Sequence, residues 1–371
     1  MFSKSSKWQC LAFIASLVFF IKCNSLESVI SPNQHTKVYQ CHFIHSAPTI
    51  DGNGNESIWK QAKWSESFVD IEGAKKAMPF YDTKMKMLWD SSYLYILANL
   101  EEEHIWGYVT EKNIPIYKYG NDFEVFIDPD RDHHNYYELE LNVLNTIWEL
   151  TLEKPYRNGG PAIDPTNLPG LKTAVGHNGT VNDPSDVDTN WVVEIAIPFQ
   201  DLYDYRKNYT RVLTQPRPIA GDIWGINFSR VHWDHEINNG KYQQVPNRPE
   251  YNWVWSQQGE INMHAPEKWG LLMFTDSTYQ EPKWRENKVR DQLMGLYKLQ
   301  EAFKKENGFF ASTIDEVDSS FLKLPYVDKL IINSDGEQYE IMAHYKSKDD
   351  QEYILKVDES SLLVKIPNTN K

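Results

Sequence analysis

Apolar and polar residues alternate along two neighbouring stretches near the middle of the chain. In residues 122–128, Phe123, Val125 and Ile127 alternate mainly with acids, and residues 136–143 repeat the pattern after a polar turn. A period of two residues is typical of half-buried strands, so we predict a β-hairpin with one face in a core. The other face carries a row of carboxylates and an amide: Glu124, Glu138, Glu140 and Asn142. Because such a row is costly to bury, we expect it to be open to solvent and to carry the function.

The same kind of pattern recurs on both sides of this hairpin. Residues 83–100 predict a second hairpin that turns at 90–92, and further short strands are expected at 171–175, 191–197, 221–233, 253–256 and 269–274. Turn residues are frequent, and a long helical pattern is absent before residue 275. The fold class predicted for residues 39–278 is therefore mainly β, an antiparallel, jelly-roll-like β-sandwich.

The pattern changes after Pro282. Val289, Leu293, Leu296, Tyr297 and Phe303 lie on one stripe at helical spacing, with Gly308 placed to end the helix. A hairpin is then expected at 330–345, interrupted by Asp335-Gly336, and more strands at 353–366. Residues 283–371 are predicted to form a small α+β appendage, whose role the sequence does not indicate.

The first 25 residues predict an export signal. Lys4 and Lys7 precede an apolar run at 10–21, which is too short to span a bilayer comfortably. Cleavage after Ser25 would release a soluble protein, whereas acylation of Cys23 would anchor a bacterial lipoprotein. Residues 26–38 are then a linker, and the protein is expected to be periplasmic, held at the cell surface or extracellular. Beyond the signal Cys41 is the single cysteine, so we expect a small buried apolar residue and no internal disulfide.

Composition narrows the class of partner. The formal net charge of −14 argues against nucleic acid and anionic membrane surfaces, since a basic surface is lacking. Aromatic residues make up 13% of the chain and include 13 tryptophans, more than packing usually demands. Of these, Trp59, Trp89, Trp191 and Trp269 are expected to pack in the core.

Rings beside carboxylates and amides favour a sugar ligand. The C–H groups of a sugar stack on aromatic faces, and its hydroxyls pair with polar side chains. A loop at 101–120, which can overhang the polar face, contributes several of the rings. The candidate stacking rings are Trp106, Tyr117, Tyr119 and Trp233, and the candidate polar partners are Glu124, Glu140, Asn142, Asn227 and Arg230.

Two acid-rich turns are candidate calcium sites. The turns 128–132 and 183–188 each gather oxygen ligands of the kind that calcium binds, namely Asp128 and Asp130 in the first and Asp183, Asp186 and Asp188 in the second. Arg131 would weaken the first site. The alternative that both turns are merely solvated stays open.

Several blocks in this order resemble the family 9 carbohydrate-binding modules over roughly residues 40–275. They are Ile50-Asp51-Gly52 with Trp59, Leu88-Trp89-Asp90, Glu124-Val125-Phe126-Ile127-Asp128, the strand 191–198 and Lys268-Trp269-Gly270. The resemblance implies a β-sandwich that holds sugar between aromatic rings, calcium in some members, and a link to xylan or glucan breakdown. The two sandwiching tryptophans of the family fall near Lys118 and Met263 here. Glu124 matches a ligand-contacting position, and an arginine position is Glu140.

We therefore predict an exported, non-catalytic protein that binds an oligo- or polysaccharide. Two alternatives remain open. A glycoside hydrolase would use carboxylates of the sheet face, among Glu124, Glu138 and Glu140. A haem or other cofactor sandwich would use residues among His232, His235, Met263 and His264, although the chain has no Cys-x-x-Cys-His motif.

Overall fold

The computed structural model describes residues 37–160, 162–163, 166–206, 216–277, 284–317, 324–347 and 350–367. They belong to two compact units, a sandwich unit within Thr36–Pro282 and a C-terminal unit within Lys283–Lys371. The predicted export signal and nearly all of the predicted linker lie outside the described residues. In the part of the chain that is described, no helix is both long enough and apolar enough to cross a membrane.

The central hairpin forms as predicted. Strands β5 (Asp122–Asp128) and β6 (Tyr136–Leu141) pair in antiparallel fashion, with Glu124 directly opposite Glu140. On its outer sides the hairpin pairs with β7 (Ile147–Leu152) and with β11 (Ile223–His232). Because cross-strand neighbours point to the same face, the acids of both strands gather on one side of this sheet.

The second predicted hairpin is also confirmed. Strand β3 (Thr83–Trp89) pairs with β4 (Tyr93–Glu101), and β4 continues through β10 (Asn190–Pro198) to β9 (Lys172–Asn178). Their apolar side chains and those of the central hairpin share one core, which includes Met87, Ile96, Val125, Leu139, Val193 and Ile195. The expected core tryptophans and Cys41 are buried, as predicted.

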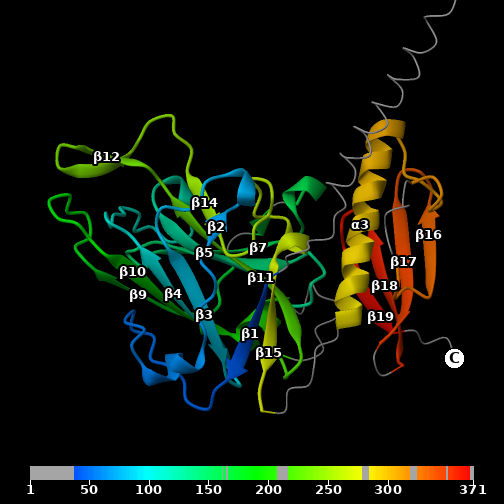
Figure 1. Cartoon of the computed structure of the whole chain (residues 1–371), viewed down its shortest axis with the longest axis horizontal. Helices are drawn as coiled ribbons and strands as arrows, with labels where there is room; N and C mark the ends of the chain where they lie inside the picture. The colour runs from blue at the N-terminus through cyan, green and yellow to red at the C-terminus, as the bar shows by residue number, and fades with distance from the viewer. Residues whose placement is uncertain are drawn as a thin grey trace, which may run out of the picture. The chain divides into compact units, whose positions relative to one another are not determined.

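Strand β1 (Val38–Phe43) joins the two halves into one curled sheet of 13 strands (Figure 1). It runs parallel to both neighbours, β3 and β15 (Gly270–Thr275). The predicted sandwich is thus confirmed, with a parallel element that alternation alone cannot reveal, since the pattern carries no strand direction. The other strands of the sheet are β2 (Val69–Asp70), β8 (Ala162–Ile163) and β14 (Tyr251–Val254).

The sequence interpretation missed one hairpin, formed by β12 (His235–Asn238) and β13 (Lys241–Gln244). Its turn is Asn239-Gly240, and both residues have positive φ, at 51° and 76°. Asn-Gly at a two-residue turn is a strong hairpin signal, so this element was within reach of the sequence. The short helices of the unit are η1 (Ser57–Gln61), η2 (Gly73–Lys75), η3 (Ile116–Lys118), η4 (Tyr156–Asn158), α2 (Phe199–Arg206) and η5 (Pro266–Lys268).

The C-terminal unit has the predicted helix and sheet. Helix α3 (Trp284–Asn307) ends where Gly308 takes a positive φ of 86° and donates its N–H to the carbonyl of Lys304. Four antiparallel strands follow: β16 (Lys329–Ser334), β17 (Tyr339–Lys346), β18 (Glu352–Asp358) and β19 (Leu363–Pro367). The apolar stripe of α3 packs with this sheet in a core of its own.

Candidate functional site

The polar row of the central hairpin is buried, so the expectation that it is open to solvent is wrong. Glu124, Glu138, Glu140 and Asn142 are between 1% and 5% exposed. The segment 109–117 covers one end of the row through backbone contacts. Glu140 Oε2 accepts hydrogen bonds from the N–H groups of Ile116 (3.1 Å) and Tyr117 (3.4 Å), and Asn142 Nδ2 donates to the Val109 carbonyl (2.9 Å). The loop that was expected to overhang this face therefore closes it.

This face of the sheet carries four buried acids that we call the acid cluster: Asp122, Glu124, Glu138 and Glu140. Asp122, Glu124 and Glu140 each place a carboxylate oxygen within 4.8 Å of the other two. Asp122 joins the row because it lies two positions before Glu124 on β5, on the same face of the sheet. The sequence interpretation did not include Asp122 among the site residues, although its alternation with Phe123 was visible.

Burial keeps these carboxyl groups protonated to unusually high pH. It raises the pKa of Glu124 to about 7, because an ionised carboxylate loses its hydration there. Burial, and after it the charge of Glu124, raise the pKa values of Asp122 and Glu138 well above their usual range. Burial also raises the pKa of Glu140, and the charge of Asp122 raises it further.

These pKa shifts predict a protein that loses stability as pH rises. The unfolded chain releases the Glu124 proton near its ordinary pKa, while the folded chain holds it until about pH 7. The contribution of protonated Glu124 to the free energy of unfolding is therefore fully present below the pKa of the unfolded chain. It is lost as the pH rises through the pKa of the folded chain. We expect the free energy of unfolding to fall by about 2 kcal/mol between pH 5 and pH 8 in buffers containing EDTA, measured by urea denaturation. The Glu124→Gln variant should show a flatter profile; a stability of the wild-type protein that rises over this range would contradict the prediction.

Asn227 and Arg230 of β11 both serve internal contacts. Asn227 Nδ2 donates to the Ser256 carbonyl and its Oδ1 accepts the Ser256 N–H, both at 2.9 Å, so this amide ties β11 to the segment after β14. Arg230 lies opposite Phe123 and thus points to the other face of the sheet. Both side chains are fully buried, which removes them from contact with a surface ligand.

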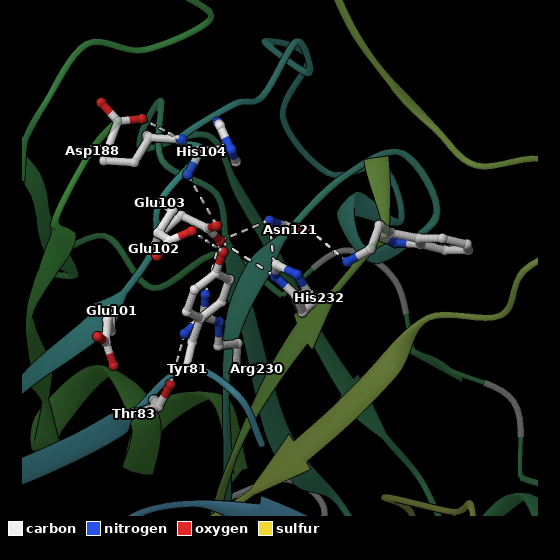
Figure 2. A network of polar contacts seen from close by, with 12 residues as sticks. Tyr81, Thr83, Glu101, Glu102, Glu103, His104, Asn121, Asp188, Arg230 and His232 are labelled. Carbon is white, nitrogen blue, oxygen red and sulfur yellow. Dashed lines mark hydrogen bonds and ion pairs between the residues drawn. The ribbon is translucent and has the colours of Figure 1, made fainter. Parts of the chain in front are cut away.

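Figure 2 shows Arg230, His232 and Asn121 converging on Glu102. Arg230 donates to Glu102 Oε2 at 2.8 Å and to Thr83 Oγ1 at 3.0 Å, and Asn121 Nδ2 donates to the same carboxylate oxygen at 3.1 Å. Burial acts to raise the pKa of Glu102, but the hydrogen bond with His232 and the charge of Arg230 together lower it. The network therefore holds a buried ion pair inside the sandwich.

The four predicted stacking rings divide into two groups. Trp106 is buried and packs nearly parallel to Tyr242, with ring centroids 6.4 Å apart. Tyr117, Tyr119 and Trp233 come together at η3, where Trp233 Nε1 donates to the Tyr117 carbonyl at 2.8 Å. Tyr119 is 55% exposed, and Tyr117 and Trp233 are partly exposed. These three rings remain accessible, and their contact with sugar stays a prediction.

A cleft of about 540 Å³ lies beside β14 and was not predicted. Phe80, 55% exposed, is its most prominent ring and stands perpendicular to the rings of Tyr251 and Trp253, at 5.4 and 4.9 Å. Polar and charged residues also line the cleft, among them Asp70, Glu72, Asp234, Arg248, Glu250 and Asn252. The signal that could have found it is Met78-Pro79-Phe80-Tyr81, an apolar and aromatic run in a loop before β3.

The two candidate calcium turns differ. The structure brings Asp128, Asp130 and Asp132 together, with one oxygen of each within 4.8 Å of the others. The acids of the second turn instead bind groups nearby: Asp188 accepts the N–H groups of Ile105 and Thr180, and Asp186 accepts the Thr180 hydroxyl. Among the described acids, Asp183, Asp186 and Asp188 do not form such a group.

The side chains considered for a cofactor lie in ordinary packing contacts. His232 Nδ1 is 3.3 Å from Glu102, and His264 Nδ1 is 3.1 Å from the Tyr136 hydroxyl. His235 packs against His104, with centroids 4.7 Å apart, and Met263 is buried beside Trp269.

The curled sandwich has the fold of a carbohydrate-binding module. Residues 50–275 match the family described as "Carbohydrate family 9 binding domain-like", and the chain belongs to this family. The resemblance found in the sequence is thereby confirmed.

Curated relatives match the sandwich unit at low identity. Endo-1,4-beta-xylanase A of Thermoanaerobacterium saccharolyticum is 26% identical over 159 residues, and exoglucanase XynX of Acetivibrio thermocellus is 25% identical over 159 residues; each match covers 43% of this chain. The chain spans 11% and 12% of the lengths of these two relatives.

Solved structures show a more distant likeness. A family 9 module of Caldicellulosiruptor kristjanssonii, solved with cellotriose, is 17% identical with a TM-score of 0.41; the match covers 65% of this chain and 95% of that one. A carbohydrate-binding protein of Bacteroides uniformis, described as putative in its structure, is 14% identical with a TM-score of 0.45 and coverages of 64% and 99%.

Proposed function

We propose that this protein is an exported, non-catalytic carbohydrate-binding protein that serves the breakdown of xylan- or glucan-type polysaccharide. Its membership of the family supports binding, and the names of the curated relatives support xylan or glucan as the polymer. Export rests on the N-terminal segment, with release after Ser25 or anchoring through Cys23 as the two routes.

The cleft beside β14 is the observation that carries the proposal. A sugar ring stacks on an aromatic face and needs hydrogen-bond partners around its rim. Phe80 offers an exposed ring, and the ion pair of Arg248 with Asp234 lies in the same cleft with Asn252. Concave sites of this volume with a few polar groups are the usual places for small ligands.

The rings at η3 form a second surface for the same ligand class. Tyr119 is exposed there, and Trp233 precedes Asp234, which lines the cleft. We assign the main contact to Phe80, because it alone of these rings lies in the described cleft together with charged and amide groups.

The Phe80→Ala variant should bind oligosaccharide about tenfold more weakly than the wild-type protein, since one stacking contact contributes about 1 to 1.5 kcal/mol. Calorimetry with cellohexaose and xylohexaose measures this change. Phe309→Ala, which removes another exposed phenylalanine in the C-terminal unit, is the matched control and should leave binding unchanged.

Three outcomes would change the proposal. If Tyr119→Ala abolishes binding while Phe80→Ala does not, the sugar site lies at η3. If the wild-type protein binds neither oligosaccharide, the proposal of carbohydrate binding fails. Release of reducing ends in the same mixtures would instead favour a hydrolase.

We further propose that the turn at 128–132 holds a structural calcium ion through Asp128, Asp130 and Asp132. Their oxygens are close enough to share one ion, and carboxylate oxygens are the ligands that calcium prefers. Such an ion would neutralise the mutual repulsion of the three carboxylates and stabilise the turn between β5 and β6.

A further inference from the structure

The acid cluster has the geometry of a cation site that is separate from the turn at 128–132. Two oxygens bound to one calcium ion at about 2.4 Å cannot lie farther apart than about 5 Å. The oxygens of Asp122, Glu124 and Glu140 meet this condition pairwise. Their backbones are held by adjacent strands, with Glu124 and Glu140 in direct register, so the sheet itself sets the spacing.

The acid cluster lacks a positive counter-charge among the described residues. Asp122 is fully buried, and neither of its carboxylate oxygens accepts a hydrogen bond from a side chain. Among the described residues, no lysine or arginine forms an ion pair with any of the four acids. Ionised groups in such a place are strongly unfavourable unless a counter-charge joins them.

Two further buried oxygens could act as cation ligands beside Asp122, Glu124 and Glu140. Glu138 Oε2 is buried and has no hydrogen-bond partner, and the hydroxyl of Ser229 is buried on the same face. Ser229 on β11 lies directly opposite Glu124, so its side chain is on the face that carries the cluster. Calcium accepts six to eight oxygen ligands, and these groups supply donors beyond the first three.

We propose that the acid cluster binds a hard divalent cation, best matched by Ca²⁺, with Asp122, Glu124 and Glu140 as ligands and with Glu138 and Ser229 beside them. The donor set consists of oxygen alone, whereas zinc and copper sites usually include histidine or cysteine. This site is distinct from the sugar cleft and from the turn at 128–132.

Cation binding would be linked to the order of the η3 segment. Glu140 also accepts the backbone N–H groups of Ile116 and Tyr117, so the residue that binds the ion holds the loop that carries Tyr117 and Tyr119. Removal of the ion takes away the bond that fixes the Glu140 carboxylate, which is the acceptor of these two N–H groups. Amide hydrogen exchange at residues 113–121 should therefore be faster in EDTA than in Ca²⁺, while exchange in β4 and β10 stays the same.

The test uses the full chain, freed of metal with EDTA and titrated calorimetrically with Ca²⁺ alone. Asp122→Asn keeps the shape of the side chain and removes one ligand charge, and it should weaken binding at this site at least tenfold. Asp130→Asn is the matched control: it removes an acid of the other group and should leave this site and the exchange rates at 113–121 unchanged. Terbium luminescence, excited through aromatic side chains, provides a second measure of occupancy in both variants.

Unfolding midpoints distinguish a loss of Ca²⁺ binding in Asp122→Asn from a failure of this variant to fold. Because asparagine cannot ionise at a position where ionisation of Asp122 is unfavourable, the unfolding midpoint of Asp122→Asn in EDTA should equal or exceed that of the wild-type protein. Ca²⁺ should raise the midpoint of the wild-type protein more than that of Asp122→Asn. If Asp122→Asn binds Ca²⁺ like the wild-type protein, or if Asp130→Asn alone removes all binding, the proposed site is wrong.

Discussion

Replacing Arg230 with methionine is expected to lower the free energy of unfolding by about 3 to 5 kcal/mol. Arg230 is fully buried and forms an ion pair with Glu102 at 2.8 Å. Its guanidinium also lies 5.2 Å from the Trp253 ring centroid, in cation–π contact. Methionine fills a similar volume but leaves the Glu102 carboxylate buried without its counter-charge, which is the main cost. Urea denaturation at pH 7 measures the loss.

Two further variants separate the buried charge from the lost packing. In Arg248→Met the arginine is 62% exposed and pairs with Asp234 at the surface, so the loss should be below about 1 kcal/mol. The double variant Arg230→Met with Glu102→Leu removes both charges and should be more stable than Arg230→Met alone. If the double variant is less stable than the single one, the stranded carboxylate is not the cause.

The second large effect is expected at Trp59, where alanine should cost about 3 to 5 kcal/mol. This side chain is buried in a small core with Leu88 and Leu97. Its Nε1 donates at 3.0 Å to Glu194, whose other oxygen accepts the N–H groups of Asp51 and Gly52. Truncation therefore opens a cavity and also weakens the contact that holds the Ile-Asp-Gly turn against β10. Thermal or urea unfolding measures the change.

Trp64→Ala is the control for this prediction. Trp64 is only five positions away and is 45% exposed, so its truncation should cost about 1 kcal/mol or less. Trp59→Phe keeps much of the ring and removes the indole donor, and its stability should fall between the wild-type protein and Trp59→Ala. Equal losses in Trp59→Ala and Trp64→Ala would show that the buried contacts of Trp59 are not what stabilises this region.

The strands and the helix were predictable because they depend on local patterns. The alternation around Val125 and Leu139 places both strands and their apolar face, and a shift of one residue would turn the apolar side chains out of the core. The stripe on α3 and the glycine at its end are equally local. The Asn239-Gly240 hairpin was predictable in the same way and was missed.

The candidate site was less predictable, because burial depends on segments far apart in the chain. Glu140 is covered by Ile116 and Tyr117, which lie 24 and 23 residues away along the chain. Arg230 was expected to face a ligand, yet it lies on the other face of the sheet and pairs with Glu102, which is 128 residues away. The cleft with Phe80 combines residues near 70–80 with residues near 234–261, and no single stretch predicts it.

The amino-acid sequence by itself determined which stretches are strands, which faces of them are apolar, and to which family the blocks from Ile50 to Trp269 are similar. Only the tertiary structure decided that the acids of the central hairpin are buried, with Glu140 under a loop, and that Phe80 stands open in a cleft. The physical reason is that alternation records a difference between two faces of a strand. Whether water or another segment covers the polar face depends on how distant parts of the chain pack.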